Sequence, residues 1–293
     1  MARILNIGSI NIDYVYTVPH FVRAGETLSS TSRQIFPGGK GMNQSIALAR
    51  AGGDVTHAGM IGSDGTYLLD ILKDAGVHTG LIAQSSGPTG HTVIQVTPEG
   101  ENCILLYSGA NQELDEAFVD KVLAPFAEGD ILILQNEVSC VPYAMKAAKD
   151  KGMKIAFNPS PFGPEILDYP LHLVDWWLLN EIEGSALTGK NNPHDMLAVM
   201  GSMYPDGVVV LTLGEEGVMC RSGGDVFSHG SYSVKVLDTT AAGDTFTGYF
   251  ISSIARGKGI EEALRLASVA ASISVSRQGA AVSIPFWDEV VGG

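Results

Sequence analysis

Six short apolar runs recur along the chain, and the stretches between them carry apolar residues at helical spacing. The runs predict buried strands at Ile4–Ile10, Val55–Ile61, Ile131–Leu134, Met153–Phe157, Leu173–Leu179 and Val208–Leu213. Helical spacing is found near residues 41–52, 65–75, 113–125, 140–150, 193–203, 242–256 and 260–276. Strands that alternate with helices form parallel sheets covered on both faces. The pattern therefore predicts an α/β fold, a three-layer sandwich with a mostly parallel central sheet.

Two regions depart from this alternation. Residues 12–37 contain short alternating runs, and residues 88–108 contain two more, His91–Val96 and Cys103–Tyr107, with a turn at Pro98–Gly100 between them. Alternation with a period of two is typical of hairpins. We interpret both regions as one small antiparallel β-sheet that forms a lid. The prediction is a core of residues 1–11, 38–87 and 112–293, with a lid of residues 12–37 and 88–111.

Composition and charge narrow the class of protein. Apolar residues make up 45% of the 293 residues and charged residues 17%, which is typical of a globular chain. With 18 basic and 32 acidic residues the net charge is −14, so we expect no nucleic acid as a partner. No apolar run of about 18 residues predicts a membrane span. Three widely separated cysteines favour reduced thiols and a cytoplasmic protein.

The segment Val236–Phe250 is the strongest candidate for chemistry. A strand is expected to end near Asp238, and the small residues Ala241, Ala242 and Gly243 then begin a helix. Free N–H groups and the helix dipole at such a start bind an anion. Asp244, in the first turn, either accepts a proton from a hydroxyl that attacks a phosphoryl group or only offsets the helix dipole.

Two N-terminal segments carry polar residues next to glycines. Gly38 and Gly39 precede a predicted helix whose first turns hold Lys40, Asn43 and Gln44, an arrangement that suits a polyhydroxylated ligand or an ordinary glycine turn. Asn11 and Asp13 follow the first strand on one side and either bracket sugar hydroxyls or form Asx turns.

Other nucleotide-binding patterns fit poorly. The segment 184–191 has the P-loop spacing but ends in Asn191, where a hydroxyl is required, and it follows a helical pattern. No G-x-G-x-x-G follows the first strand, which disfavours a nicotinamide-dependent dehydrogenase.

Taken together, Gly38-Gly39-Lys40-Gly41-x-Asn43-Gln44 and the segment from Asp238 to Asp244 resemble the ribokinase-like, or PfkB, family of carbohydrate kinases over nearly the whole chain. The resemblance implies ATP-dependent phosphoryl transfer to a sugar hydroxyl, with the 5-hydroxyl of D-ribose as the first expectation. Deoxyribose, fructose or another ketohexose and a nucleoside stay open as acceptors, as does a non-catalytic sugar-binding protein. The lid residues Tyr14 and Tyr16, and Met42, depart from the family pattern. The family also implies a homodimer through the lid.

The resemblance further implies a role for each matching residue. Asp244 is expected to be the base, and the N–H groups of Ala241, Ala242 and Gly243 the anion hole. The residues expected to bind sugar are Asn11, Asp13, Gly38, Gly39, Lys40, Asn43 and Glu137. Those expected to bind nucleotide are Asn180, Thr212, Gly214 and Gly217. Glu183 is expected to bind Mg²⁺ through water, and K⁺ is expected at Asp238, Thr240 and Ser283 with the carbonyls of Ser274, Arg277 and Gly279.

Overall fold

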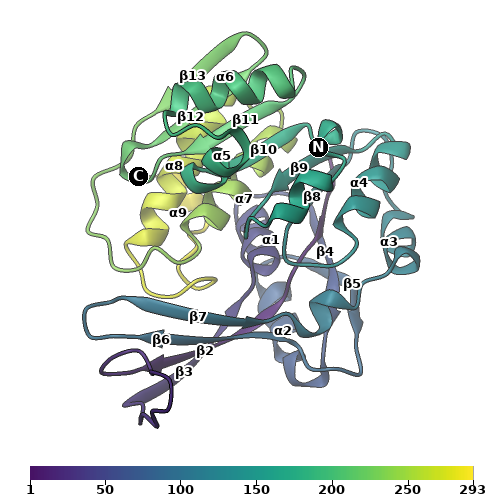
Figure 1. Ribbon diagram of the computed structural model, residues 1–293. Coiled ribbons are helices and arrows are strands. Elements are labelled where there is room, and N and C mark those ends of the chain that lie inside the picture. Colours follow the sequence, from purple (N-terminus) through teal and green to yellow (C-terminus); the bar gives the residue numbers. More distant parts are fainter. Residues whose placement is uncertain (293) are drawn as a thin grey trace.

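A nine-stranded sheet crosses the molecule in the order β13-β12-β11-β10-β9-β8-β1-β4-β5 (Figure 1). The computed structural model describes residues 1–292. The strands from β5 to β11 along this order are parallel, and β12 and β13 join one edge antiparallel. Their bounds are β1 Ile4–Ile7, β4 Val55–Ile61, β5 His78–Gln84, β8 Ile131–Gln135, β9 Lys154–Asn158, β10 Trp176–Asn180, β11 Val208–Thr212, β12 Val218–Ser222 and β13 Asp225–His229.

Helices cover both faces of this sheet. Successive strand residues point to opposite faces, so Ile4 and Ile131 pack in one core while Leu5 and Leu132 pack in the other. The first core lies under α1 (Lys40–Arg50), α2 (Tyr67–Asp74), α7 (Ala242–Ala255), α8 (Ile260–Val275) and α9 (Trp287–Val291). The second lies under α3 (Glu116–Leu123), α4 (Val141–Asp150), α5 (Glu181–Thr188) and α6 (Pro193–Met203). The predicted three-layer α/β fold is confirmed.

Several elements differ from the sequence prediction. The first strand ends at Ile7, not Ile10, because the chain leaves the sheet at Gly8 and turns toward the lid. The strand expected at Leu173–Leu179 begins at Trp176, since Leu171–Leu173 form a 3-10 turn after Pro170. The prediction also omitted α5, α9 and the strands β5, β12 and β13. Strands β5 and β13 form the two edges of the sheet, where partial exposure mixes polar residues into the apolar pattern. The strand β12, next to β13, has only three buried residues.

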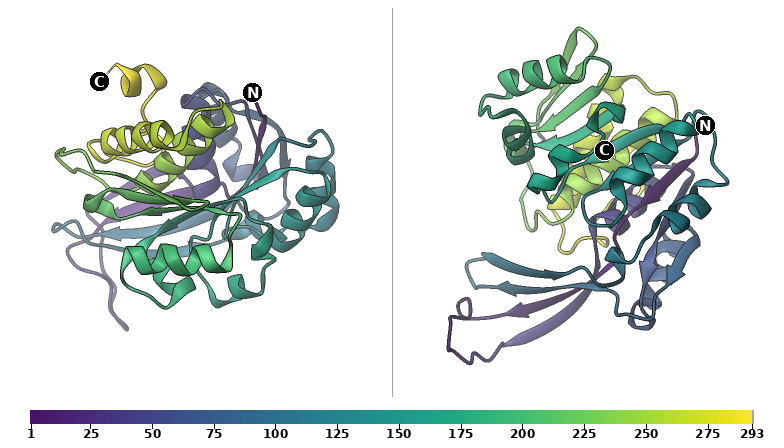
Figure 2. Two further views of the ribbon diagram at one scale, coloured as in Figure 1. Left: turned by 90° about the horizontal axis from the view of Figure 1, so that it is seen from above. Right: turned by 45° about the vertical axis from the view of Figure 1, so that its right-hand side comes forward.

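A second sheet of four strands projects from one end of the core (Figure 2). Its order is β3-β2-β6-β7, with bounds β2 Asn11–Thr17, β3 Ser32–Gly38, β6 Gly90–Val96 and β7 Asn102–Tyr107. The two predicted hairpins, β2–β3 and β6–β7, are antiparallel, but β2 pairs with β6 in parallel. That pairing is possible because the chain passes through the core between β3 and β6, a connection long enough for a parallel return. The division into core and lid domains stays a prediction.

The parallel strands β1, β8, β9, β10 and β11 all end at the same edge of the central sheet. The chain winds outward from β1 in both directions, so β1 and β8 mark the point where the strand order reverses, the usual place for a ligand in such sheets. Within residues 1–292, no helix combines the length and the hydrophobicity needed to cross a membrane.

Candidate active site

Two adjoining cavities open at this edge of the sheet. The first, of about 220 Å³, is lined by the ends of β9, β10 and β11 and by the start of α7. The second, of about 680 Å³, lies between Gly214, Gly217 and the faces of α7 and α8. Thr212, Thr239, Ala242, Gly243 and Phe246 line both cavities. The two cavities therefore form one continuous elongated site around the start of α7.

The start of α7 is shaped to bind an anion. Ala241 adopts a left-handed conformation, with φ of 61°, which costs energy in a residue with a Cβ and turns the chain sharply into the helix. The N–H of Ala242 donates to the carbonyl of Thr239 at 3.2 Å. Among the described residues, the N–H groups of Ala241 and Gly243 have no protein acceptor. They lie at the positive end of a 14-residue helix and line the first cavity.

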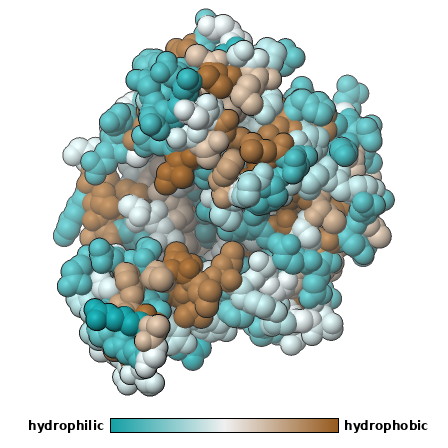
Figure 3. All heavy atoms as spheres, in the orientation of Figure 1, coloured by the Kyte–Doolittle hydropathy of each residue, from teal (hydrophilic) through white to brown (hydrophobic). Residues whose placement is uncertain are grey.

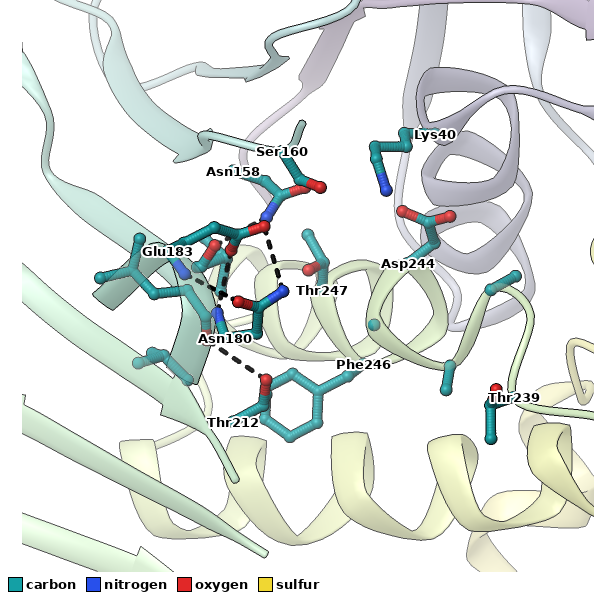
Figure 4. A pocket seen from close by; sticks show the side chains of 16 residues that line it. Lys40, Asn158, Ser160, Asn180, Glu183, Thr212, Thr239, Asp244, Phe246 and Thr247 are labelled. Atoms are coloured by element: carbon teal, nitrogen blue, oxygen red, sulfur yellow. Dashed lines mark hydrogen bonds between the residues drawn. The ribbon is translucent and has the colours of Figure 1, made fainter. Parts of the chain in front are cut away.

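Asp244 is buried at the floor of the first cavity. One carboxylate oxygen accepts from Nδ2 of Asn43 at 3.0 Å, and the other accepts from Nε2 of Gln44 at 2.9 Å. Figure 4 shows the Lys40 ammonium pointing toward this carboxylate. The Oδ1 atom of Asn43 is buried without a hydrogen-bond partner within the described part of the chain. A buried acceptor of this kind is costly unless a ligand donates to it.

The N-terminus of α1 is held against the end of β1. A Cβ at Gly41 would lie 2.4 Å from the Ser9 nitrogen, so only glycine allows this approach. The Lys40 N–H donates to Oε2 of Glu137 at 3.0 Å, and the Ser9 hydroxyl donates to the same oxygen. Burial raises the pKa of Glu137 despite the nearby Lys40 ammonium. Burial alone would lower the pKa of Lys40, but the carboxylates around it outweigh that effect and raise it.

Asn11 and Asp13 lie on one face of β2, two residues apart, where the lid meets the core. Oδ1 of Asp13 accepts from the Thr92 hydroxyl at 2.6 Å, and burial raises the pKa of this carboxyl despite that bond. A Cβ at Gly38 would lie 2.0 Å from Asp13, so glycine leaves the space for the carboxylate. Oδ1 of Asn11 accepts from Asn111 at 2.7 Å.

Asn180 and Glu183 form the first turn of α5 as a capping box. Oδ1 of Asn180 accepts from the Glu183 N–H, and Oε2 of Glu183 accepts from the Asn180 N–H, each at 2.9 Å. The Glu183 side chain is buried at the wall of the first cavity, and burial raises its pKa (Figure 4). A carboxylate facing the cavity is a hard oxygen donor, which suits Mg²⁺ held through water.

The residues predicted to bind a monovalent cation lie together behind the start of α7. The carboxylate of Asp238 accepts from the N–H groups of Thr240 and Gly279, each at 2.9 Å, which joins two loops. The buried hydroxyls of Ser274 and Ser283 are 2.8 Å apart. These groups and the nearby carbonyls are all oxygen donors, so the set fits a hard cation. The Arg277 side chain turns away to pair with Glu289, which leaves only its carbonyl for such a role.

Some residues of the site were not predicted. Asn158, Ser160, Thr239, Phe246 and Thr247 line the first cavity. Asn158 directly follows a predicted strand, so the rule that selected Asn11, the polar residue at a strand end, also identifies it. The second cavity is lined partly by Tyr232, Val234 and Val236, in a segment without helix or strand, where the sequence has no periodicity to interpret.

Comparison with known proteins gives consistent matches over the whole chain. The family model of the pfkB family carbohydrate kinases matches residues 1–287. A ribokinase of Haemophilus influenzae is 40% identical over 97% of this chain and 96% of its own. The structure of a ribokinase from Cryptococcus neoformans in complex with ADP superposes with a TM-score of 0.87 at 34% identity, covering 100% of this chain and 99% of that chain. An Arabidopsis thaliana ribokinase complexed with ribose and ATP gives a TM-score of 0.88 at 29% identity, covering 100% and 98%.

Proposed function

The chain belongs to the pfkB family of carbohydrate kinases, and we propose that it transfers a phosphoryl group from ATP to the 5-hydroxyl of D-ribose with Asp244 as the base. Ribokinase relatives, and a related structure that holds ribose and ATP, support ribose as the acceptor. The observation that carries the mechanism is the position of Asp244. Its carboxylate lies in the same cavity as the unpaired N–H groups of Ala241 and Gly243. Base and anion site are therefore adjacent, as in-line transfer requires.

The step needs one proton acceptor and charge stabilisation. The ribose oxygen forms a bond to the γ-phosphorus while the bond from that phosphorus to the bridging oxygen of ADP breaks. Asp244 takes the hydroxyl proton, and the Asn43 and Gln44 amides hold its carboxylate in place. Negative charge on the transferring group is met by the N–H groups at the start of α7 and by the Lys40 ammonium.

Two cations fit the donors present. Glu183, with Asn180 beside it, would hold Mg²⁺ through water, and Asp238, Thr240 and Ser283 with neighbouring carbonyls would hold K⁺. When bound, Mg²⁺ would neutralise charge on the phosphates, and K⁺ would add positive potential behind the anion hole. Within the protein, Asp238 joins the loop of the anion hole to the loop at Gly279 through its two hydrogen bonds.

The sugar would lie between the lid and α1. The buried, unpaired Oδ1 of Asn43 needs a donor, and a sugar hydroxyl supplies one. Asp13 and Glu137 offer carboxylate oxygens to further hydroxyls, with Asn11, Gly38, Gly39 and Lys40 completing the walls. In the second cavity, Thr212, Gly214 and Gly217 would contact the nucleotide. Closing the lid over the sugar would exclude water, which otherwise accepts the phosphoryl group.

The lid also suggests how two copies associate. Ile104, Leu105 and Tyr107 on β7 are 56%, 70% and 53% exposed, and apolar side chains gather on the lid beside the hollow next to the core (Figure 3). Exposed apolar side chains that gather on one element favour contact with another protein surface. The partner proposed here is the lid of a second copy of this chain. Leu105→Glu should convert a dimer to a monomer in light scattering, whereas Val226→Glu on β13 should not. A monomeric parent protein would contradict this part of the proposal.

The function is tested by ADP release on a panel of ribose, deoxyribose, fructose and nucleosides with ATP, Mg²⁺ and K⁺ present. We expect turnover on ribose above all others. Asp244→Asn should lower kcat by roughly a hundred- to ten-thousandfold while ribose and ATP still bind in calorimetry. The control Asp225→Asn, on the exposed edge strand β13, should be unchanged. An Asp244→Asn variant with near-normal kcat would disprove the assigned base.

A further inference from the structure

A chain of buried polar side chains runs from Asp244 through the core, between α1 and the central sheet, to His57 on β4. It consists of Gln44, Gln135, Asn6, Ser45 and His57, none of which exposes any surface. They come from α1 and from three neighbouring strands, β8, β1 and β4. We propose that Gln44 is a positioning residue for Asp244 and that this directed chain of hydrogen bonds sets the orientation of its amide. The inference rests on the proposed function, since Asp244 is the base there.

The direction of the chain follows from Asn6, in its middle, and from His57, at the end away from Asp244. Nδ2 of Asn6 lies 2.8 Å from the Gly41 carbonyl, which can only accept, so this atom must be the nitrogen. Oδ1 of Asn6 then accepts from Nε2 of Gln135 at 3.1 Å. The same nitrogen donates to Oε1 of Gln44 at 2.7 Å. The side-chain NH₂ group of Gln135 therefore donates both to Asn6 and to Gln44.

This fixes which end of the Gln44 amide meets the base. Because Oε1 of Gln44 accepts from Gln135, its NH₂ group faces Asp244 and donates at 2.9 Å. A reversed amide would place an oxygen against the carboxylate. Reversing Gln135 instead would place its oxygen against two other acceptors, so neither amide can turn alone. This arrangement has a cost at Gln135, whose Oε1 is buried with no hydrogen-bond partner among residues 1–292, at a point where a Cβ on Gly8 would lie 2.5 Å away.

The other end of the chain terminates on a neutral histidine. The Ser45 hydroxyl accepts from Asn6 at 2.8 Å and lies 2.8 Å from Nδ1 of His57. Nε2 of His57 lies 3.2 Å from the Gly8 carbonyl, which requires a proton on Nε2. Nδ1 is then the acceptor and Ser45 the donor. Burial lowers the pKa of His57 to about 4, which keeps the ring neutral at ordinary pH.

Gln44 thus acts on the reaction through Asp244 and without contact with the sugar. Loss of its donor leaves the carboxylate free to rotate away from the position in which it accepts the hydroxyl proton. We expect kcat to fall and the KM for ribose and ATP to change little. The other charged groups facing Asp244 are Lys40, Glu137 and Glu183, and they are unchanged in the variants below.

The experiment measures kcat and the KM for ribose and ATP in Gln44→Met and Gln135→Met. Gln44→Met should lower kcat by about ten- to a hundredfold, the range for one hydrogen bond to a charged group. Gln135→Met, which touches neither Asp244 nor the sugar, should lower kcat by a smaller factor with KM little changed. The matched control Gln84→Met, at the exposed end of β5, should behave as the parent.

Two outcomes would overturn the inference. The first is parent-like kcat in both variants, even if their melting temperature falls, since that describes a merely structural role. The second needs no variant: ¹⁵N spectra of the parent should show His57 neutral and protonated on Nε2 from about pH 5.5 to 8, and the Nδ1 tautomer would break the chain. If the parent turns over no ribose, the proposed function fails, while the tautomer still tests the chain.

Discussion

Gly248 packs α7 directly against α1, and substituting it should lower the rate of catalysis although it lies outside the cavity. A Cβ there would lie 2.3 Å from the Cβ of Ala47 and 2.8 Å from the Leu48 nitrogen. Carbon atoms in contact are about 3.5–4.0 Å apart, so Gly248→Ala must separate the two helices by roughly 1 Å. Overpacking of this kind lowers the free energy of unfolding by about 1–3 kcal/mol, and replacing a glycine within a helix by alanine raises it by about 1 kcal/mol.

We therefore expect Gly248→Ala to lower the free energy of unfolding by about 2 kcal/mol at most, a fall of roughly 4–8 °C in Tm. The larger effect should be on kcat. Asp244 lies one turn before Gly248 on α7, and its partners Asn43 and Gln44 lie one turn before Ala47 and Leu48 on α1. Hydrogen bonds of 2.9 and 3.0 Å do not survive a separation of that size. A tenfold or greater fall in kcat, on the order of 1.4 kcal/mol, is expected in folded protein.

The assay is steady-state ADP release well below the melting temperature, with urea unfolding measured on the same samples. Gly80→Ala serves as control, because a Cβ in that strand meets nothing within 4 Å. The double variant Gly248→Ala with Ala47→Gly removes the closest contact and should recover part of kcat without recovering stability, since it adds a glycine to α1. Parent-like kcat and Tm in Gly248→Ala would refute the reasoning that helix contact positions the base.

Three further predictions concern residues outside the cavity. Burial raises the pKa of Asp238, but the N–H and hydroxyl donors around it outweigh that effect and hold the pKa below its usual range, so its stabilising contribution is present at neutral pH and is lost in acid. Asp238→Ala should therefore lower stability more at pH 7 than at pH 3 in urea titrations, and an equal loss at both would contradict this. The buried ring of His57, with a pKa of about 4 when folded against 6.5 unfolded, should reduce stability by roughly 3 kcal/mol as pH falls from 6.5 to 4. His57→Met should remove that slope, which unfolding at a series of pH values measures. The Arg50 guanidinium donates to two carbonyls of the turn that carries Ser283. Arg50→Met should raise the K⁺ concentration for half-maximal activity, and an unchanged K⁺ titration would exclude a link between that turn and the cation.

Strands buried on both faces were predictable, because burial gives an unmixed apolar signal, and the strand Val55–Ile61 has the predicted bounds. The helix Pro193–Met203 also has the predicted bounds, since its buried residues Met196, Leu197 and Met200 recur at helical spacing. The edge strands could not be predicted in this way, since β5 has exposed residues at both ends and β13 mixes exposed with half-buried positions. The parallel pairing of β2 with β6 could not be predicted either. It depends on the path that the chain takes through the core between the two strands, and not on the sequence of either strand.

The residues of the candidate site also fall into two groups, those that the sequence identifies and those that it does not. Segments where glycine and a polar residue are close in sequence, such as Gly38 to Asn43 or Ala241 to Asp244, were recognisable because local backbone geometry places their groups. The chain from Gln44 to His57 was not recognisable, since it joins α1 to three strands that are far apart in sequence. Asn6 and His57 each resemble a single polar residue inside an apolar strand. The pairing of β1 with β4 sets Asn6 beside His57, and the pairing of β1 with β8 brings Gln135 to the same face.

The balance of charge in the site supports the proposal that the reaction uses cations. Among the described residues lining the first cavity, Lys40 is the one basic side chain, and it shares that cavity with Asp244 and Glu183, while Glu137 lies beside it. One ammonium against these carboxylates leaves the cavity negative before ATP brings its phosphates. The N–H groups at the start of α7 supply about half a unit charge through the helix dipole, which cannot balance a triphosphate. The proposed Mg²⁺ near Glu183 would bring positive charge with the nucleotide, and the proposed K⁺ near Asp238 would add it behind the anion hole. A single lysine would then be sufficient, because it would orient the reacting groups while the cations neutralise most of the charge.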